Sequence, residues 1–434
     1  MTDDVRIEPA AAPPPPPPAR PPVPPLTRRG IPVDPGLRAL ALSTLVNTIG
    51  NGALTTTFAL YFTRIVHISP ALVGLALSAA ALAGLVVQLP IGHLSDSRGP
   101  RELARLLLVA AGVCALGLTV ARSPWLLVAV LSLEAVFDNG ARAVRSGVIA
   151  RLGAGGQAVQ FRAYLRSMTN VGISLGALAG GLALTVDKPW AYQSVFVLDA
   201  VTFMATGLLM GRLPHLSPAP PREVGQPRLQ VLRDLPYVVV SALSAVYTIH
   251  FFVIELGLPL WLVRETTAPK SLVALLVLVN TVAVALFQVR MSRNTDRVRP
   301  ASRAMFVGSL WIAGGFALTG FASHRERPAA VAMLCAGALV HVVGEMLGSG
   351  GQWGVHMGLA PQERQGQYQG FAGTGFSLAN VLAPSVIVVL CVQWGRPGWL
   401  VLGAAIVLAG ALIVPASAWA LRTRERYGVH THTG

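Results

Sequence analysis

The sequence predicts an all-α membrane protein that crosses the lipid bilayer many times. Of its 434 residues, 53% are hydrophobic and only 12% are charged, about half the charged share of a typical soluble domain. Asp, Glu, Lys and Arg are absent from long stretches of the chain, among them 65–95, 167–186 and 365–395. A helix needs about 20 apolar residues to cross a bilayer core of about 30 Å, and each of these stretches is long enough.

Apolar runs punctuated by Gly, Pro and Arg predict twelve membrane-spanning helices. We expect errors of about four residues at the helix ends. An even number of spans puts both ends of the chain on one side of the membrane. The predicted spans cover residues 38–63, 70–94, 103–121, 124–149, 161–186, 190–211, 237–263, 270–290, 304–322, 327–353, 366–392 and 397–421.

The distribution of basic residues indicates which side that is. A net charge of +15 would suggest nucleic-acid binding in a soluble protein, but here the charge lies in short loops, so no nucleic-acid partner is expected. With a cytoplasmic N-terminus, 26 of the 34 Lys and Arg residues lie inside and 8 outside, a bias typical of membrane insertion. The sequence therefore predicts a multi-pass protein of the inner (cytoplasmic) membrane with both termini in the cytoplasm.

The chain divides into five predicted segments. Residues 1–37 contain the tract AAPPPPPPARPPVPP, which favours polyproline II and cannot pack a core. We expect a disordered cytoplasmic leader there; a ligand for a proline-binding partner is the alternative. Six-helix bundles are predicted at 38–212 and 237–421, a polar cytoplasmic linker at 213–236 and a cytoplasmic tail at 422–434. The three cysteines lie in apolar segments and indicate neither disulfides nor a metal site.

The two predicted bundles echo each other in sequence. Paired six-helix halves around a central site are a common plan among transporters. Three features recur in the same order, at offsets of 200, 207 and 210 residues: Asp96 and Asp296, Glu134-Asp138 and His341-Glu345, and Asn170-Val171 and Asn380-Val381.

The loop after the second span carries a motif, GHLSDSRGPR at residues 92–101. This segment resembles the helix 2–3 loop motif of the major facilitator superfamily, in which glycines, an aspartate and basic residues recur at fixed spacing. Ser97 and Pro100 replace basic residues of that motif. The residues that fit are Gly92, Asp96, Gly99 and Arg101, and a partial second copy keeps Asp296 and Arg297.

This resemblance implies the major facilitator fold, with twelve transmembrane helices in two six-helix pseudo-repeats. A glycine at a helix end lets a neighbouring helix approach, and the aspartate can cap the positive N-terminus of that helix or pair with an arginine. In the family this latch holds the cytoplasmic face closed, and we expect Arg142 to be the partner of Asp96. The alternative is that these charges only mark a cytoplasmic loop.

The fifth span has a glycine repeat, GISLGALAGG at 172–181. It resembles the antiporter motif of drug:proton exporters, with Ala177 where those have proline. Glycines at this spacing share one face of a helix and allow close packing, so Gly172, Gly176, Gly180 and Gly181 are predicted packing residues. The Gly-x-Ser-x-Gly pattern within it also matches a hydrolase nucleophile motif, but it lies inside a membrane helix and not on a strand-turn-helix. No enzymatic activity is expected.

Acidic side chains inside membrane spans are expensive and indicate function. On the fourth span, Glu134, Asp138, Arg142 and Arg145 share one face. Asp138 lies one turn from Arg142 and is expected to be a charged structural or gating partner. Glu134 lies deeper, where burial favours a protonated carboxyl, so it is the first candidate for a proton carrier. An ion-pair ladder of all four residues is the alternative.

The remaining candidates lie on four other spans. His341 and Glu345 are one turn apart and could move protons, although a membrane histidine often only hydrogen-bonds a neighbouring helix, which is the reading preferred for His250. The sequence offers no account of Asp199. Candidate residues of a substrate cavity are Asn47, Asn51, Arg142, Tyr247, His250, Phe251 and Glu255, with Phe252 a weaker one.

Together these features predict a secondary active transporter. It is expected to export hydrophobic or cationic small molecules, drugs or metabolites, in exchange for protons by alternating access, with no cofactor beyond the proton gradient. Acids outnumber bases at depth, which disfavours an anionic substrate. The alternatives are a proton-coupled importer of a nutrient or metabolite and, in another class, a non-transporting receptor or scaffold. The expected partners are the small-molecule substrate and the lipid bilayer, and the chain is expected to be a monomer.

Overall fold

The computed structural model describes residues 32–152, 158–213, 215–216 and 229–424. The predicted leader, most of the predicted linker and most of the predicted tail lie outside the described residues.

The first six spans are long helices, and most begin at a proline, whose missing N–H costs nothing in a first turn. The Asp34 side chain caps the first of them by accepting a hydrogen bond from the Leu37 N–H at 3.0 Å. The helices are α1 (Pro35–Leu60, continued by a π-helical turn at Tyr61–Ile65), α2 (Pro70–Arg98), α3 (Pro100–Leu118), α4 (Pro124–Leu152), α5 (Ala158–Val186) and α6 (Pro189–Met210).

The second six spans include one that is interrupted by a π-helical turn and one that ends in such a turn. Pro259 lacks the N–H that an unbroken α-helix would require, which explains the break in the seventh span. The spans are α7 (Leu235–Thr248) with a π-turn at Val253–Gly257 and α8 (Leu258–Glu265), then α9 (Leu272–Met291), α10 (Val298–Phe321), α11 (Arg327–Leu359), α12 (Gln365–Ile387, with a π-turn at Val388–Gln393) and α13 (Arg396–Thr423).

The prediction of an all-helical protein with twelve spans is confirmed. Nine of the twelve, among the described residues, are long and apolar enough by themselves to cross a membrane. The other three, α1, α3 and α4, carry more polar or charged residues. Two predicted ends were six residues short: α10 begins at Val298 and α11 ends at Leu359. Both extensions carry polar or basic residues, so hydropathy could not find them.

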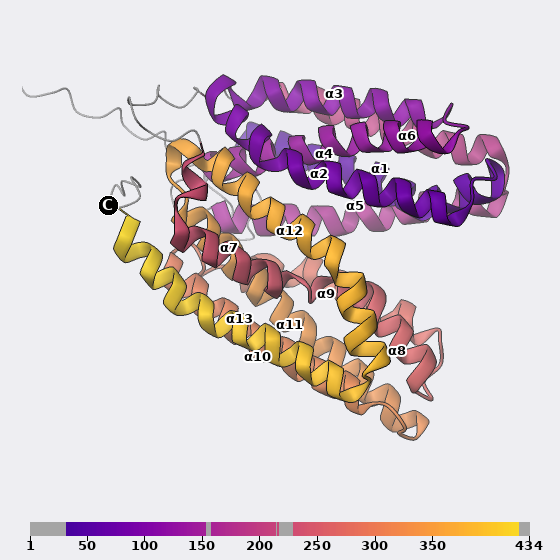
Figure 1. Ribbon diagram of the computed structural model, residues 1–434, viewed down its shortest axis with the longest axis vertical. Helices are drawn as coiled ribbons and strands as arrows, with labels where there is room; N and C mark the ends of the chain where they lie inside the picture. The colour runs from indigo at the N-terminus through magenta and orange to yellow at the C-terminus, as the bar shows by residue number, and fades with distance from the viewer. Residues whose placement is uncertain (1–31, 153–157, 214, 217–228, 425–434) are drawn as a thin grey trace, which may run out of the picture.

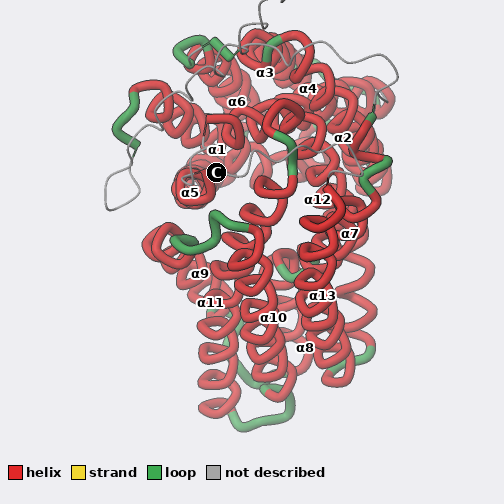
Figure 2. The backbone as a smooth tube through the Cα atoms, turned by 90° about the vertical axis from the view of Figure 1, so that its left-hand side faces the viewer, coloured by secondary structure: helices red, strands yellow, loops and turns green. Residues whose placement is uncertain are grey.

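The twelve spans form two groups, α1–α6 and α7–α13, which Figure 1 shows above and below and Figure 2 shows from the side. They meet where α2 and α4 end and α12 begins, a place that we call the Asp96 end. Helix α12 packs along α2 and α4, and α9 packs along α5. From this end the two groups diverge toward the opposite end (Figure 1).

Candidate functional site

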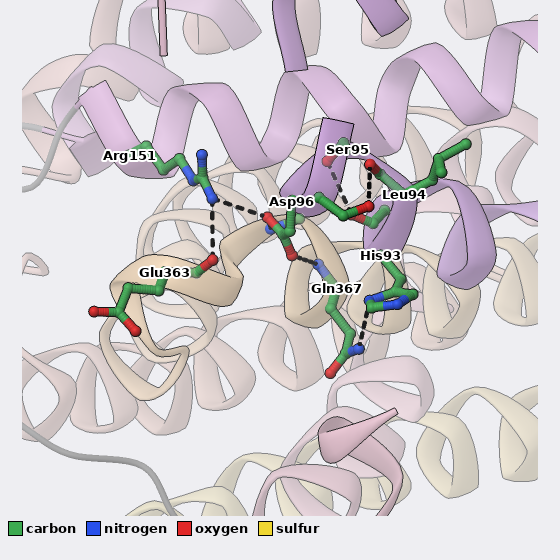
Figure 3. Close-up of polar contacts among 10 residues, drawn as sticks. His93, Leu94, Ser95, Asp96, Arg151, Glu363 and Gln367 are labelled. Atoms are coloured by element: carbon green, nitrogen blue, oxygen red, sulfur yellow. Dashed lines mark hydrogen bonds and ion pairs between the residues drawn. The ribbon is translucent and has the colours of Figure 1, made fainter. Parts of the chain in front are cut away.

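The Asp96 end is held by a contact between the two groups of helices (Figure 3). The Asp96 carboxylate accepts hydrogen bonds from the N–H groups of Gly366 and Gln367, at 3.0 and 2.8 Å, and so caps the N-terminus of α12. The Arg151 guanidinium at the end of α4 lies 3.3 Å from the same carboxylate and donates a hydrogen bond to the Glu363 carbonyl at 3.0 Å. Asp96 therefore makes both contacts that the sequence offered as alternatives.

Gly92 lets the helices approach closely enough for this contact. A Cβ atom added to Gly92 would lie 3.0 Å from the Gly366 carbonyl carbon and 3.3 Å from the Gly370 Cα. Both are backbone atoms, which cannot move aside as a side chain can. Gly99 has a φ of 89° in the short link between α2 and α3, a conformation that glycine adopts without strain. Gly92 thus lies at the close approach between α2 and α12, and Gly99 forms the link between α2 and α3.

The predicted partner of Asp96 was wrong. Asp96 pairs with Arg151, whereas Arg142 donates to Asp138 on its own helix, with its Nε 3.0 Å from the carboxylate. Arg151 lies nine residues further along α4, about 13 Å nearer the end of the helix, where Asp96 is. Arg101 also stays within the first group of helices, because its guanidinium donates to the Leu213 carbonyl at 3.0 Å.

The second copy of the motif makes the mirrored contact in a weaker form. The Asp296 carboxyl lies near the Val159 N–H in the first turn of α5, and its Oδ1 has no hydrogen-bond partner in the described chain. Burial raises the pKa of Asp296 to about 6, against the opposing effect of the nearby Val159 N–H. Arg297 is exposed. The two copies therefore differ: Asp96 has an arginine partner and two backbone donors, whereas the described residues give Asp296 no ion pair.

Asp296→Asn should change how stability depends on pH. Because the folded carboxyl has the higher pKa, wild type gains stability from this group as the pH falls from about 7 toward 4. The asparagine keeps an acceptor for Val159 but cannot bind a proton, so this gain disappears. Solvent screening limits the effect to about 1 kcal/mol or less.

Thermal unfolding of the purified chain at pH 5 and pH 7 measures this effect. The control is Glu363→Gln, an exposed acid at the same end. An unchanged pH dependence in Asp296→Asn would show that the carboxyl is not stabilised in its protonated form.

Helix α4 buries the two acids that the sequence singled out. Glu134 and Asp138 are both buried, but only Asp138 has a cationic partner, Arg142, whose side chain is 51% exposed. The Arg142–Asp138 pair is the one ion pair among these four residues, and the Nη1 of Arg145 is buried without a hydrogen-bond partner in the described residues. The four-residue ladder is therefore not formed. The proton-carrying role of Glu134 stays a prediction.

Asp199 on α6 is the most isolated acid of the first group. It is 1% exposed, and neither of its carboxylate oxygens has a hydrogen-bond partner among the residues described. It packs against α1, where a Cβ on Gly50 would lie 2.6 Å from its Oδ1. On the same helix Asn47 is buried with an unpaired Oδ1, and Asn51 is half-buried. The sequence offered no account of Asp199, because nothing near it in the chain indicates its burial.

The glycine repeat of α5 packs against α1. Cβ atoms on Gly172, Gly176 and Gly180 would meet the α1 backbone, so these three glycines lie where α5 approaches α1. Gly181 has nothing within 4 Å of its Cβ position, contrary to the prediction that it packs, because one residue turns the helix by about 100°. Helix α5 is continuous, as Ala177 allows.

In the second group, Glu345 is held by contacts from two other helices. The Arg166 guanidinium on α5 lies 3.2 Å from its Oε1, and the Asn280 amide on α9 donates to its Oε2 at 2.8 Å. Arg166 also lies over the Phe251 ring, 5.0 Å from its centroid. The ion pair therefore joins the two groups of helices, with the Glu345 side chain 5% exposed and the Arg166 side chain 29% exposed.

The predicted His341–Glu345 pair is replaced by these contacts. His341 is buried, and its ring stacks on Phe316 with centroids 5.5 Å apart. His250 lies 5.4 Å from the His341 ring, and all four ring nitrogens of the two histidines lack hydrogen-bond partners in the described part of the chain. The expectation that His250 hydrogen-bonds a neighbouring helix was therefore wrong: it packs through ring contacts.

The other candidates of the seventh span are placed differently from one another. Tyr247 is buried with an unpaired hydroxyl against the glycines of α10 and α11. Phe251 and Phe252 are half-buried and face Phe376. Glu255 is exposed in the π-turn. Only Phe251 among them contacts the ion pair between the two groups.

Sequence reasoning missed Arg162, Arg166 and Asn280. The two arginines were counted only as positive charges on one side of the membrane. Their spacing of four residues, on one face of α5, was the available signal. Within the residues described, no three His, Cys, Asp or Glu side chains are grouped to hold a metal ion.

Comparison with known proteins identifies the family. Residues 40–260, half of the chain, match the family model of the Major Facilitator Superfamily. "Sugar efflux transporter A" of Dickeya chrysanthemi is 27% identical over 170 residues, 38% of this chain and 40% of that protein. A "Putative sugar efflux transporter" of Deinococcus radiodurans is 27% identical over 234 residues, 52% of this chain and 58% of that protein. The chain thus spans only about half the length of the curated relatives that it matches.

Solved structures share the fold at low sequence identity. A bacterial homologue of the iron transporter ferroportin, in an outward-facing state, superposes with a TM-score of 0.66 at 15% identity over 89% of this chain and 99% of that one. A proton:xylose symporter bound to a bromo-deoxyglucose superposes with a TM-score of 0.65 at 14% identity, over 89% and 95% of the two chains. With the paired helical groups, the glycine and aspartate contacts between them and the family match, the chain belongs to the major facilitator superfamily.

Proposed function

We propose that this membrane transporter exports a small molecule by alternating access, rocking its two groups of helices about a site between them. The observation that carries the proposal is the position of the contacts that join the groups. Three contacts join the groups: the Asp96 cap, the Gly92–Gly366 approach and the Arg166–Glu345 pair. The first two lie at the Asp96 end, and the third lies between that end and the middle of the helices. Opening this end would require breaking a small, defined set of polar contacts.

The Asp96 end is proposed to be cytoplasmic. The loops that adjoin it carry most of the Lys and Arg residues of the chain. Loops rich in Lys and Arg stay on the cytoplasmic side of the membrane during insertion. The described arrangement then faces outward, closed toward the cytoplasm. Both termini lie inside in this proposal, as expected from the sequence.

Export is proposed to be driven by protons carried on buried carboxyls. Glu134 and Asp199 are both buried in the first group, and neither carboxylate oxygen of Asp199 has a hydrogen-bond partner in the described structure. Leaving an ionised carboxylate buried without a partner is costly, so a proton must accompany these groups whenever water is excluded. Asp199 joins Glu134 as a carrier for this reason.

The substrate is proposed to be a hydroxyl-rich molecule of the sugar type. The two curated relatives are named for sugar efflux, which supports export over import and sugars over other classes. The second candidate is a lipophilic cation, the class expected for a drug:proton antiporter, because the first group of helices buries three acids away from the Asp96 end: Glu134, Asp138 and Asp199.

Transport into inverted membrane vesicles tests the proposal. Vesicles that contain wild type should accumulate labelled glucose or xylose when an inward-acid gradient is imposed, and a protonophore should abolish this accumulation. Accumulation of a fluorescent lipophilic cation instead would favour the second candidate. No gradient-driven movement of either class would contradict export by proton exchange.

Glu134→Gln and Asp199→Asn should each abolish gradient-driven accumulation and leave exchange at equal concentrations intact. A neutral isostere preserves shape but cannot carry a proton. Glu326→Gln, an exposed acid at the start of α11, is the control and should behave as wild type. Normal accumulation by Asp199→Asn would remove Asp199 from the coupling path.

A further inference from the structure

Five arginines lie on the halves of α4 and α5 nearest the Asp96 end, and three of them have carboxylate partners. Arg142 pairs with Asp138, Arg151 with Asp96 and Arg166 with Glu345. Arg145 and Arg162 have no ion pair or hydrogen bond within the described ranges, and each has a buried Nη1. Buried donors are nearly always satisfied in proteins, so these two arginines need an explanation.

Arg162 has the more informative surroundings. It lies one turn from Arg166 on the same face of α5, and its guanidinium sits over the ring of Trp353 on α11, 5.8 Å from the centroid. Tyr237 and His356 both lie near enough to interact electrostatically with Arg162. The Tyr237 hydroxyl and the His356 Nδ1 are hydrogen-bonded to each other at 3.3 Å. An aromatic face compensates a guanidinium partly. The aromatic ring does not accept the hydrogen bonds that a guanidinium donates in its own plane. The geometry of those donors fits the oxygens of a carboxylate or a phosphate.

The position of Arg162 between the two groups of helices is also defined. It lies four residues from the start of α5 at Ala158, about 6 Å along the helix. Trp353 covers it from the other group of helices. Any separation of α5 from α11 at the Asp96 end would lift Trp353 away and present the guanidinium to the side that the proposed function identifies as cytoplasmic.

We infer that Arg162 binds the acidic group of the transported molecule, so that the substrate is a small organic anion such as a sugar acid or a sugar phosphate. This inference rests on the proposed export function and narrows its substrate class. It runs against the expectation that acids at depth disfavour an anion. That expectation compared the numbers of acids and bases inside the spans. Asp138 and Glu345 already form ion pairs with arginines, whereas Arg162 has no acidic partner among the described residues.

Ligand binding to the purified full-length chain in phosphatidylcholine nanodiscs tests the inference. Gluconate and glucose 6-phosphate should bind wild type, and glucose, their neutral counterpart, should bind more weakly. Arg162→Gln should raise the Kd of both anions roughly ten- to hundredfold, the effect of losing hydrogen bonds from a charged group, and leave glucose unchanged. Arg162→Lys should fall between, since it keeps the charge and loses the fork.

The control variant is Arg105→Gln, an exposed arginine on α3, which should bind all three sugars as wild type does. Thermal unfolding without ligand checks that Arg162→Gln is folded. Adding phosphatidylglycerol to the nanodiscs distinguishes the other source of phosphate. If Arg162→Gln weakens the binding of phosphatidylglycerol but not of gluconate or glucose 6-phosphate, the arginine binds a lipid headgroup and the substrate inference is wrong.

The vesicle assay separates this inference from the proposed function. Equal affinity for glucose and the anions, or anion binding unaffected by Arg162→Gln, would overturn the anion site even if glucose is exported. Anion binding that depends on Arg162, without gradient-driven transport of any sugar, would support the site and refute proton-driven export.

Discussion

Replacing Gly92 with alanine should open the Asp96 end and reduce transport strongly. The added Cβ would lie 3.0 Å from the Gly366 carbonyl carbon and 3.3 Å from the Gly370 Cα, both on α12. Overpacking of this kind costs about 1–3 kcal/mol. Because the clash exists only in the closed arrangement, that cost shifts the equilibrium between states by roughly 5- to 150-fold.

Distances between spin labels at Ser97 and Gln362, two exposed positions on either side of the contact, report the opening. The background replaces Cys114, Cys335 and Cys391 with alanine. Gly74→Ala on the same helix is the matched control, since a Cβ there meets nothing within 4 Å. It should keep the wild-type distance distribution. The same distribution in Gly92→Ala would show that the close approach does not govern closure.

Breaking the Arg166–Glu345 pair should have an effect of similar size. Glu345 is 5% exposed and receives one hydrogen bond from Asn280 besides its arginine. Removing one partner of a buried pair costs about 3–5 kcal/mol, and less here, because the arginine is partly exposed. Arg166→Gln and Glu345→Gln should each destabilise the closed arrangement and slow transport at least about tenfold, the equivalent of 1.4 kcal/mol.

A double-mutant cycle isolates the pair. Arg166→Gln/Glu345→Gln should be less impaired than the sum of the single variants, because neither charge is left alone. Arg64→Gln is the control: its pair with Asp187 is exposed and lies within one group of helices, so its loss should be nearly silent. Strict additivity of the two single variants would mean that the ion pair does not couple the groups.

The fold could be predicted almost entirely from the sequence, and the reason is local. Whether a segment spans the bilayer depends on its own apolar length, so twelve spans could be counted before any contact was known. The predicted helix ends were wrong mainly where a helix extends beyond its apolar segment, as at Val298 and Leu359. The glycines of α5 could be assigned to packing for the same reason, except Gly181, whose face of the helix is open.

The site was predictable only where its residues are neighbours in the chain. Asp138 and Arg142 are one turn apart and do form a pair. The pairs Asp96–Arg151 and Arg166–Glu345 join residues 55 and 179 positions apart, and no spacing rule indicates them. Sequence reasoning therefore chose Arg142 for Asp96 and His341 for Glu345, since each was the nearest suitable group in sequence.

The sequence by itself determined that this is a twelve-span membrane protein with a duplicated plan and a glycine-aspartate motif of the major facilitator type. These properties follow from apolar length, from charge along the chain and from backbone requirements at single positions. Only the tertiary structure decided which charges are matched. A buried charge is stable only beside a partner, and its partner is chosen by which helices pack together. Where the two groups of helices meet, Arg166 pairs with Glu345, and Arg162 has no acidic partner among the described residues.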